Sequence, residues 1–223
     1  MKGYMKMDIN NELLKFDKDI FKEKDIKVKD EGFEKLMFIY SSAIKELEVK
    51  INIMKEQFNY FYNYNLINSV KSRIKEPNSI IKKMKKKNYE LTYQDMIEKI
   101  NDVAGIRITC PLKQDIFIVK EMIKSFPNCN IIKEKDYINK PKKSGYSSYH
   151  LIVEIPVNVA QGIFPVKVEI QICTMAMDFW SNLEHEVKYK PTKKVSSKIS
   201  KELISCAQLV NKLDDKMMKI YNT

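Results

Sequence analysis

The sequence predicts an α+β fold in which one mixed β-sheet is flanked by helices, with long helices near the N- and C-terminal ends. Two observations predict this class. Helical signals lie toward both ends of the chain, whereas apolar and polar residues alternate over several stretches in the middle, as they do in strands. With 223 residues, 44% of them hydrophobic, the chain can bury a substantial core, and its length favours one domain.

Residues 1–30 are polar and rich in lysine. We expect a polar N-terminal arm there, followed by a single domain over residues 31–223. A long amphipathic helix is predicted from Glu31 to Phe58, because apolar or aromatic residues recur at three- and four-residue steps and no Gly or Pro follows Gly32. The apolar stripe consists of Leu36, Tyr40, Ile44, Leu47, Ile51 and Met54.

The segment 72–87 is predicted to be a loop that enters a helix, since Pro77 suits the first helical position. This helix would carry a narrow apolar stripe on an otherwise lysine-covered surface. A short helix over 92–100, a strand over 104–110 and a helix over 113–126 are expected next. On the strand, alternation places Arg107 on the face opposite Ile106 and Ile108.

After a turn at 127–130, a strand is expected to run into a polar loop over 135–147. Strands over 148–156 and 164–173 flank a connection that contains Gly162, which predicts a hairpin. A helix over 175–190 would end at Pro191, and Ser196 or Ser197 would cap the last helix. The helix over 175–190 is expected to bury Ala176, Phe179, Trp180, Leu183 and Val187.

Composition limits the class of protein. The excess of 40 Lys and Arg over 29 Asp and Glu gives a net charge of +11, which favours a polyanionic partner such as a nucleotide, a nucleic acid or an anionic membrane. Alternatively, a biased genome explains the dispersed lysines. The four cysteines form no Cys-x-x-Cys pair, which argues against structural zinc. Without a signal-peptide core or a bilayer-length apolar run, we expect a cytoplasmic protein with reduced thiols that does not enter a membrane.

Two acidic residues lie at predicted strands. Asp102 stands where a helix gives way to a strand, and Glu169 shares a strand face with Lys167 and Gln171, which meets either water or a cleft. Mg²⁺ is commonly held by one or two carboxylates together with substrate phosphate oxygens, so Asp102 and Glu169 would suffice if their strands are adjacent. Other carboxylates that the sequence places no worse are Asp136, Glu154 and Asp178.

Basic residues are densest from Arg73 to Lys87. Most lysines on a helix are simply solvated, whereas Arg73 and Lys75 precede the predicted helix and are better placed to bind a ligand. Arg offers a fork for phosphate oxygens or a plane on which a base stacks, and Lys offers a point charge.

Tyr146 follows Gly145 in a turn rich in Lys and Ser, where it would either stack a base or cover an apolar edge. His150 and His185 would either orient a phosphate or carboxylate or serve the structure alone. The chain lacks the P-loop, the Gly-x-Gly-x-x-Gly fingerprint, His-Glu-x-x-His and Gly-x-Ser-x-Gly, which argues against the common NTPase, dehydrogenase, metalloprotease and hydrolase classes.

Several ordered motifs together resemble the synthetase domain of the RelA/SpoT family, and the size of the chain resembles that of a small alarmone synthetase. The resemblance covers about residues 72–190. It rests on Ser72-Arg73-Ile74-Lys75 with Ser79-Ile80-Ile81, Asp102-Val103-Ala104-Gly105-Ile106-Arg107, Lys135-Asp136-Tyr137, Gly145-Tyr146, Ser148-Tyr149-His150, Val168-Glu169-Ile170-Gln171-Ile172, Trp180 and Leu183-Glu184-His185.

The resemblance implies a nucleotidyltransferase-like sheet and transfer of the β,γ-pyrophosphoryl group of ATP to the 3′-hydroxyl of GDP or GTP, with release of AMP and formation of ppGpp or pppGpp. GMP is a third candidate acceptor. Asp102 and Glu169 would bind Mg²⁺, and Glu169 would assist the metal or take the hydroxyl proton. The implied ATP-binding residues are Arg73, Lys75, Lys83 and Arg107, and those for the guanosine nucleotide are Lys142, Tyr146, His150 and Gln171.

The chain departs from the family pattern at Cys173, where Arg is common, and at Ser147 and Ser144. These departures remove cationic groups near the phosphates and would affect acceptor preference and rate. Our hypothesis is that nearby lysines supply the missing positive charge. Those lysines are Lys140, Lys142 and Lys143. Neither histidine precedes an Asp, so the His-Asp hydrolase of larger members is not expected.

The resemblance further implies a homo-oligomer, commonly a tetramer, and an alarmone or single-stranded RNA as a regulator. Two alternatives to an active synthetase remain. One is a nucleic-acid-binding module in which the basic helix follows phosphates and Tyr146 stacks a base. The other is a catalytically impaired paralogue that binds nucleotides or single-stranded RNA, and the residues at 173 and 147 motivate it.

Overall fold

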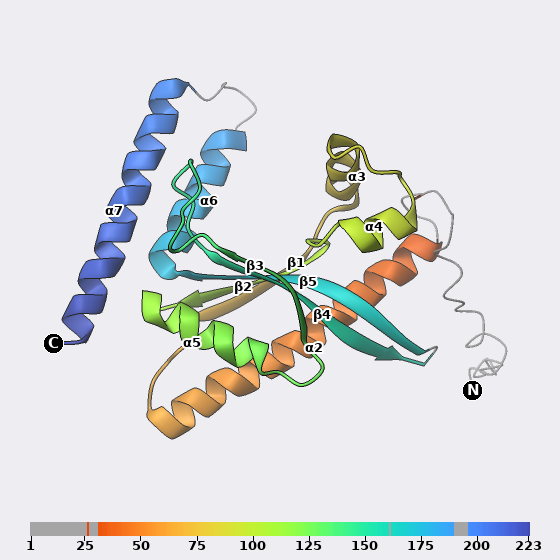
Figure 1. The fold of residues 1–223 in the computed structure, drawn as a ribbon, viewed down its shortest axis with the longest axis horizontal. Coiled ribbons are helices and arrows are strands. Elements are labelled where there is room, and N and C mark those ends of the chain that lie inside the picture. Colours follow the sequence, from red (N-terminus) through yellow and green to blue (C-terminus); the bar gives the residue numbers. More distant parts are fainter. Residues whose placement is uncertain (1–25, 27–30, 161, 190–195) are drawn as a thin grey trace, which may run out of the picture.

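The computed structural model describes Ile26 and residues 31–160, 162–189 and 196–223. One mixed sheet lies at its centre, with strands in the order β1-β2-β5-β4-β3 (Figure 1). β2 and β5 are parallel, and the other neighbouring pairs are antiparallel. The strands are β1 (Ser69–Ile74), β2 (Ala104–Cys110), β3 (Asn130–Asp136), β4 (Tyr149–Val159) and β5 (Gly162–Thr174).

Helices surround this sheet on three sides. α2 and α5 cover one face, while α3 and α4 stand to one side of the other face and α6 and α7 to the opposite side (Figure 1). The predicted α+β class is therefore confirmed. The helices are α2 (Glu31–Tyr62), α3 (Pro77–Lys86), α4 (Tyr93–Lys99), α5 (Lys113–Lys124), α6 (Met175–Tyr189) and α7 (Ser197–Tyr221).

The core lies between the sheet and the layer of α2 and α5. Alternate residues of the central strands point into it, among them Ile106 and Ile108 on β2 and Ile170 on β5, all at most 1% exposed. The six predicted stripe residues of α2 are all buried. Because the apolar residues of β2 and β5 point into this layer, the polar residues between them are left on the opposite, uncovered face.

Local signals placed most elements correctly. α3 begins at Pro77, α7 is capped by Ser196, whose Oγ accepts a hydrogen bond from Ile199 N, and β2 has the predicted bounds. The hairpin of β4 and β5 is longer than predicted: its last pair is Val159 with Gly162, and Gly162 adopts a φ of 130°. No helix within the described ranges is long and apolar enough to cross a membrane.

Two predictions were wrong. Residues 69–74 form the edge strand β1, although the sequence predicted a loop from Ser72, because pairing with β2 rather than a local apolar pattern holds this polar segment extended. On α6, Phe179 and Leu183 are 64% and 44% exposed instead of buried. The helix turns a different stripe inward, with Met177 and Trp180 buried. Residues 1–25, 27–30 and Pro191 lie outside the described residues.

Candidate active site

Strand register gathers polar residues on the uncovered face of the sheet. Lys71 on β1 pairs with Arg107 on β2, Arg107 pairs with Gln171 on β5, and Gln171 pairs with His150 on β4. Paired residues in neighbouring strands point to the same face, so these four side chains form one row. Two residues away on each strand, and therefore on the same face, a second row contains Arg73, Gly105 and Glu169. Residues up to 100 positions apart in the sequence thus share one surface.

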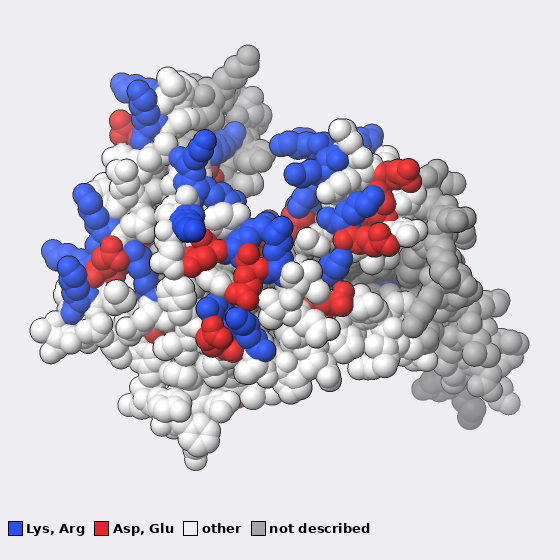
Figure 2. All heavy atoms as spheres, in the orientation of Figure 1, with Lys and Arg blue, Asp and Glu red and all other residues white. Residues whose placement is uncertain are grey.

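A cleft of about 690 Å³ lies over these two rows. Its size falls within the usual range of small-molecule sites. Figure 2 shows the molecule hollowed between α3 on one side and α6 with the loop before β4 on the other, with Lys and Arg on both sides. Predicted site residues that line the cleft are Arg73, Asp102, Arg107, Lys142, Tyr146, His150, Glu169 and Gln171. Lys75 and Lys83 do not line the cleft themselves, but both form ion pairs with Asp102, which does.

Asp102 is held between two ammonium groups. Lys75 Nζ lies 3.0 Å from its Oδ2, and Lys83 Nζ lies 2.7 Å from its Oδ1. Local structure explains both contacts: the Lys75 amide donates to Val103 O at 2.8 Å, which prolongs the β1–β2 pairing, and α3 turns Lys83 toward the sheet. Burial alone would raise the pKa of Asp102, but the two lysines outweigh it and hold the pKa below its usual value.

Glu169 lies in the middle of a chain of hydrogen bonds that runs from Tyr146 to Arg107. Its Oε1 is 3.2 Å from His150 Nδ1, and its Oε2 accepts from Gln171 Nε2 at 2.8 Å. Tyr146 Oη is 2.8 Å from the other ring nitrogen of His150. Burial would raise the pKa of Glu169, yet His150 and Gln171 lower it on balance, against a smaller opposing effect of the charge of Asp102. The two predicted catalytic carboxylates therefore interact electrostatically, and both favour the ionised form.

Tyr146 lies on a tight turn whose conformation depends on glycine. The Gly145 amide donates to Lys142 O at 2.8 Å, the Lys142 amide donates to Tyr146 O at 3.0 Å, and Gly145 has a φ of +90°. Lys142 Nζ lies over the rings of Tyr146 and Tyr137, 4.6 and 4.7 Å from their centroids. Burial raises the pKa of Tyr146 to about 12, so its hydroxyl remains a hydrogen-bond donor at neutral pH.

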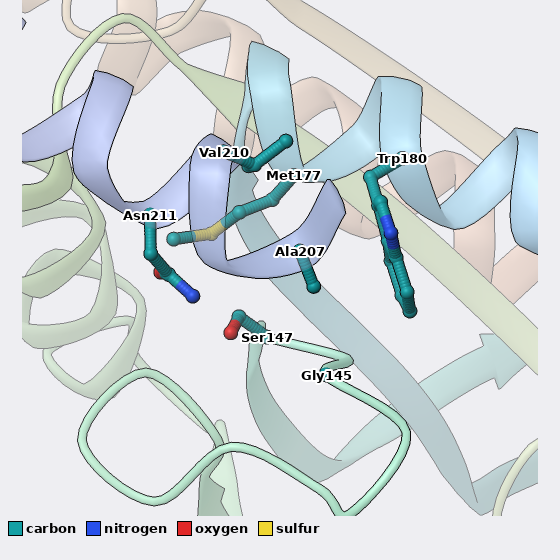
Figure 3. A pocket seen from close by; sticks show the side chains of 7 residues that line it. All are labelled: Gly145, Ser147, Met177, Trp180, Ala207, Val210 and Asn211. Carbon is teal, nitrogen blue, oxygen red and sulfur yellow. The ribbon is translucent and has the colours of Figure 1, made fainter. Parts of the chain in front are cut away.

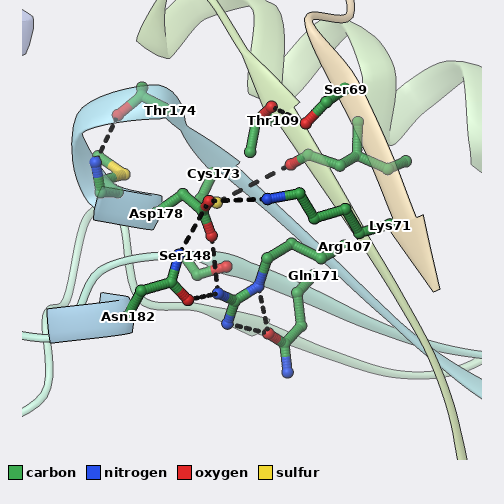
Figure 4. Close-up of polar contacts among 12 residues, drawn as sticks. Ser69, Lys71, Arg107, Thr109, Ser148, Gln171, Cys173, Thr174, Asp178 and Asn182 are labelled. Atoms are coloured by element: carbon green, nitrogen blue, oxygen red, sulfur yellow. Dashed lines mark hydrogen bonds and ion pairs between the residues drawn. The ribbon is translucent and has the colours of Figure 1, made fainter. Parts of the chain in front are cut away.

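Arg107 is fixed in place by residues from two other elements. Its Nη1 donates to Asp178 Oδ1 on α6 at 2.8 Å, and its Nη2 donates to Gln171 Oε1 on β5 at 2.8 Å (Figure 4). Lys71 Nζ approaches the other oxygen of Asp178 at 3.9 Å. A guanidinium held on two sides presents a fixed plane to the cleft.

The structure shows which of the three alternative carboxylates named from the sequence line the cleft. Asp136 closes its own turn by accepting from the amides of Ile138 and Asn139, and it does not line the cleft. Glu154 lies further along β4, opposite Lys167, and does not line it either. Asp178 does line it, but as the partner of Arg107.

Sequence reasoning missed Lys71 and Tyr137 as site residues, and it named Asp178 only as an alternative carboxylate, not as the partner of Arg107. Lys71 belongs to the strand that was predicted as loop, and Asp178 is 71 residues from Arg107 in the chain. The spacing of Asp178 and Asn182, which bond each other at 3.2 Å across one helical turn, is the only local signal. His185 also lines the cleft.

Two of the three residues that depart from the family pattern, Cys173 and Ser147, are buried beside the site, whereas Ser144 is half-buried. Cys173 is 3% exposed and its Sγ is 3.9 Å from Ile108 O (Figure 4). Burial raises the pKa of this thiol to about 12, so it is neutral and adds no charge to the cleft. Ser147 is 5% exposed, and its Oγ has no hydrogen-bond partner among the described residues.

The acidic residues present fit a magnesium ion that is shared with a substrate. No group of three or more His, Cys, Asp or Glu side chains within the described ranges could hold a metal by itself. Mg²⁺ needs only one or two carboxylates when phosphates supply further oxygens. Asp102 Oδ1 is buried and has no hydrogen-bond partner of good geometry among the described residues, although Lys83 Nζ lies 2.7 Å away. Asp102 and Glu169 are thus a suitable donor pair.

Comparisons with known proteins agree with this geometry. Residues 72–194 match the family model described as the region found in RelA / SpoT proteins. GTP pyrophosphokinase YwaC of Bacillus subtilis (strain 168) is 40% identical over 196 residues, which cover 88% of this chain and 93% of that protein.

Two solved structures of small alarmone synthetase 1 from Bacillus subtilis are also similar. The structure bound to its product pppGpp has a TM-score of 0.80 and 35% sequence identity, and covers 86% of this chain and 98% of that one. The structure bound to AMPCPP has a TM-score of 0.74 and 31% identity, and covers 86% and 97%. The expected family resemblance is confirmed over most of both chains.

Proposed function

The chain belongs to the family defined by the region found in RelA / SpoT proteins, and on that premise we propose that it is a GTP pyrophosphokinase that makes (p)ppGpp. In this reaction the 3′-oxygen of a guanosine nucleotide attacks the β-phosphorus of ATP. The bond between that phosphorus and the α,β-bridging oxygen breaks, and AMP leaves. The observation that carries the proposal is that distant parts of the sequence bring Asp102, Glu169, two arginines and the Tyr146 ring into one cleft.

We assign ATP to the side of the cleft formed by β1 and β2. Arg73 and Arg107 are diagonal neighbours on these strands, since Arg73 pairs with Gly105, two residues before Arg107. Diagonal neighbours lie roughly 7–8 Å apart, which is about twice an atomic contact distance and leaves room for one flat ring between two guanidinium planes. A planar adenine between them fits this spacing. Gly105 supports the arrangement because it presents no side chain beneath Arg73.

Lys75 and Lys83 would bind the phosphates of ATP. In the absence of nucleotide their ammonium groups neutralise Asp102. Phosphoryl-type transfer leaves little covalent chemistry to the protein, so positioned cations of this kind provide much of the rate enhancement. Mg²⁺ held by Asp102 and Glu169 would, when bound, neutralise developing charge on the phosphate oxygens.

We assign the guanosine nucleotide to the opposite side, where Tyr146 would stack the base and Lys142 and Gln171 would contact its polar groups. Glu169 is the candidate base for the 3′-hydroxyl, because its carboxylate stays ionised at neutral pH and His150 fixes its orientation. The acceptors we propose are GDP and GTP, with GMP as a third candidate. Lys140, Lys142 and Lys143 would replace the charge that Cys173 and Ser147 do not supply.

Assembly, regulation and location complete the proposal. Exposed apolar side chains on α2, α6 and α7 suit a homo-oligomer, for which we propose a tetramer. These side chains include Phe38, Val49, Ile53, Phe179, Leu209, Leu213 and Met217. Size-exclusion chromatography with light scattering measures the assembly.

An alarmone or single-stranded RNA is proposed as the regulator of the enzyme. The cytoplasm is proposed as its location, in keeping with free thiols at all four cysteines.

The decisive experiment incubates the purified full-length chain with ATP, Mg²⁺ and GMP, GDP or GTP in parallel, and separates AMP from the phosphorylated guanosine products. We expect equal amounts of AMP and product with GDP or GTP. Asp102→Asn keeps the size of the side chain and removes its charge, and should lower the rate by about two orders of magnitude or more, as loss of a single charge-stabilising group typically does.

Each alternative function has its own signature in this assay. A nucleic-acid-binding module would yield no AMP and would bind RNA with a steep salt dependence. An impaired paralogue would bind nucleotides at Tyr146 and yield no AMP. Incubation of the wild-type protein with ppGpp and Mn²⁺ should release no GDP, because we propose synthesis without hydrolysis.

A further inference from the structure

The turn that carries Tyr146 packs directly against the C-terminal helix α7. A methyl group added to Gly145 would lie 2.4 Å from Ala207 Cβ and 3.7 Å from Ile204 Cα, so the turn and the helix are as close as the absence of a side chain allows. Figure 3 shows the Ala207 side chain of α7 pointing toward Gly145 and Ser147 of the turn. The turn therefore packs against the surface of α7 without a gap at Gly145.

α7 is itself anchored to the rest of the domain. Trp180 Nε1 on α6 donates to Leu203 O at 2.9 Å. Thr174 Oγ1, at the end of β5, donates to the buried Asp214 Oδ2 at 2.7 Å. Near the C-terminal end, Lys113 of α5 forms an ion pair of 2.7 Å with Asp215. Three elements thus fix the position of Ala207 relative to the sheet.

Consecutive residues of the turn have different environments. Tyr146 lines the substrate cleft, where its hydroxyl lies 2.8 Å from His150 Nε2. Its neighbours Gly145 and Ser147 line a separate small cavity together with Ala207. That cavity has a volume of about 10 Å³, which leaves room for about one water molecule. The turn consequently has little space into which it could move without displacing α7 or the Tyr146 ring.

We propose that Ala207 is a positioning residue for the guanosine nucleotide: its small side chain on α7 sets the depth of the turn and hence the place of the Tyr146 ring. The inference rests on the function proposed above and extends it to a helix outside the cleft, since Ala207 does not line the cleft. A larger side chain at this position pushes Gly145 toward the cleft and tilts the ring away from the base. The ATP side, formed by β1 and β2, is unaffected.

Steady-state kinetics of Ala207→Leu test the inference, with KM measured separately for ATP and for GDP. Overpacking of a close contact typically costs enough free energy to change binding about tenfold, so we expect about a tenfold rise in KM for GDP and less than twofold for ATP. Ser205→Leu is the matched control, because it adds the same side chain to an exposed position on the opposite side of α7. Ala207→Ser, nearly the size of the wild type, should restore the GDP KM.

A second measurement uses the only tryptophan of the chain, Trp180, whose Cζ2 would lie 3.7 Å from a methyl group on Gly145. Its fluorescence should change on titration of wild-type protein with GDP, and Ala207→Leu should shift the midpoint of that change to about tenfold higher GDP. This readout does not require turnover, and a thermal unfolding curve shows whether the variant is folded.

The outcomes separate the two proposals. An active wild type in which Ala207→Leu leaves the GDP KM unchanged, or raises both KM values equally, overturns the role of Ala207 and leaves the proposed function intact. A wild type that forms no AMP overturns the proposed function. If such a protein also shows no fluorescence response to GDP, the positioning role is overturned with it, whereas a response that Ala207→Leu weakens supports the role at a binding site.

Discussion

Asp102 and Glu169 are half-buried in the cleft and yet have lowered pKa values, because each has partners that favour its charge. Lys75 and Lys83 compensate Asp102, and His150 with Gln171 compensates Glu169. Burial without partners would have the opposite effect. A site that needs ionised oxygen ligands at neutral pH therefore depends on these neighbouring residues as much as on the acids themselves.

Removal of His150 should move the pH dependence of the reaction. Among the interactions that lower the pKa of Glu169, those with His150 are the largest, so His150→Ala raises that pKa. A base with a higher pKa loses its charge at a higher pH, and the acidic limb of kcat/KM should shift to higher pH. A pH–rate profile from pH 4 to 8 measures the shift. His185→Ala should leave the limb in place, and an unshifted limb in His150→Ala would show that another group sets it.

The ring and the hydroxyl of Tyr146 should contribute separately to catalysis. Stacking of a base on an aromatic ring is worth about 1–3 kcal/mol, so Tyr146→Ala should lower kcat/KM for GDP by roughly 5- to 150-fold. Tyr146→Phe keeps the ring and loses only the contact of 2.8 Å with His150, so its defect should be smaller. Equal defects in the two variants, with GDP varied at saturating ATP, would argue against stacking.

At the scale of elements, α3 places chemically identical side chains in different environments. Lys83 faces the sheet and lies 2.7 Å from Asp102, whereas Lys85, two residues on, is exposed. Sequence composition alone does not distinguish them, and periodicity does so only once the buried face is known. Ile80 and Met84 define that face, since both are fully buried.

These two lysines provide a matched test of the ATP site. A hydrogen bond to a charged group is worth about 1.5–3 kcal/mol, so Lys83→Ala should lower kcat/KM for ATP by about 10- to 150-fold. Lys85→Ala removes the same charge from the same helix and should change it by less than about twofold. Initial rates at varied ATP and saturating GDP give kcat/KM for ATP in each variant. Comparable losses in both variants would indicate that only the overall positive charge of α3 matters.

Elements whose signals are local were predicted well, and those fixed by distant contacts were not. Pro77 and the alternation over 104–110 suffice for the start of α3 and for β2. β1 could not be predicted, because its sequence Ser-Val-Lys-Ser-Arg-Ile is mostly polar and its extended form depends on β2. On α6, periodicity identified apolar stripes but not which of them faces the sheet, so Phe179 and Leu183 were misplaced.

The candidate site shows the same division. The cleft gathers eight of the residues predicted from motifs, since each motif lies on a strand or beside one. The contact of Arg107 with Asp178 spans 71 residues, and that of Lys113 with Asp215 spans 102. Nothing in either local sequence identifies its partner, so such positioning contacts emerge only from the folded chain.

On the scale of the whole molecule, two buried acidic residues outside the cleft, Asp115 and Asp214, differ from Asp102 and Glu169. Asp115 is fully buried where the chain after α2 meets the start of α5, and its Oδ2 accepts from Tyr64 Oη at 2.8 Å and from the Leu112 amide at 2.9 Å. Burial outweighs both hydrogen bonds and raises the pKa of Asp115. Burial likewise raises the pKa of Asp214, which anchors α7. Asp115 and Asp214 therefore favour protonation, whereas Asp102 and Glu169 favour the charged form.

This difference predicts the pH dependence of stability. A folded-state pKa above the unfolded value of about 3.9 means that the contribution of Asp115 is fully present below that pH and is lost as pH rises through the folded pKa. Asn at position 115 keeps an acceptor oxygen for the two donors and does not titrate. The wild type should therefore lose stability relative to Asp115→Asn as pH rises above about 4, with a slope of at most about 1.4 kcal/mol per pH unit.

Urea unfolding of both proteins at half-unit intervals from pH 4 to 7.5 measures this difference. Asp136→Asn is the control of opposite sign: burial would raise the pKa of Asp136, but hydrogen bonds from Asn139 and Ile138 outweigh it and lower that pKa. The wild type should gain stability relative to Asp136→Asn as pH rises from the lowered pKa of Asp136 toward 3.9. Above pH 4 the stability difference between these two proteins should therefore stay constant, whereas the difference between wild type and Asp115→Asn should change with pH. A difference between wild type and Asp115→Asn that stays constant with pH would mean that Asp115 is charged in both states and that its burial is better compensated than its contacts imply.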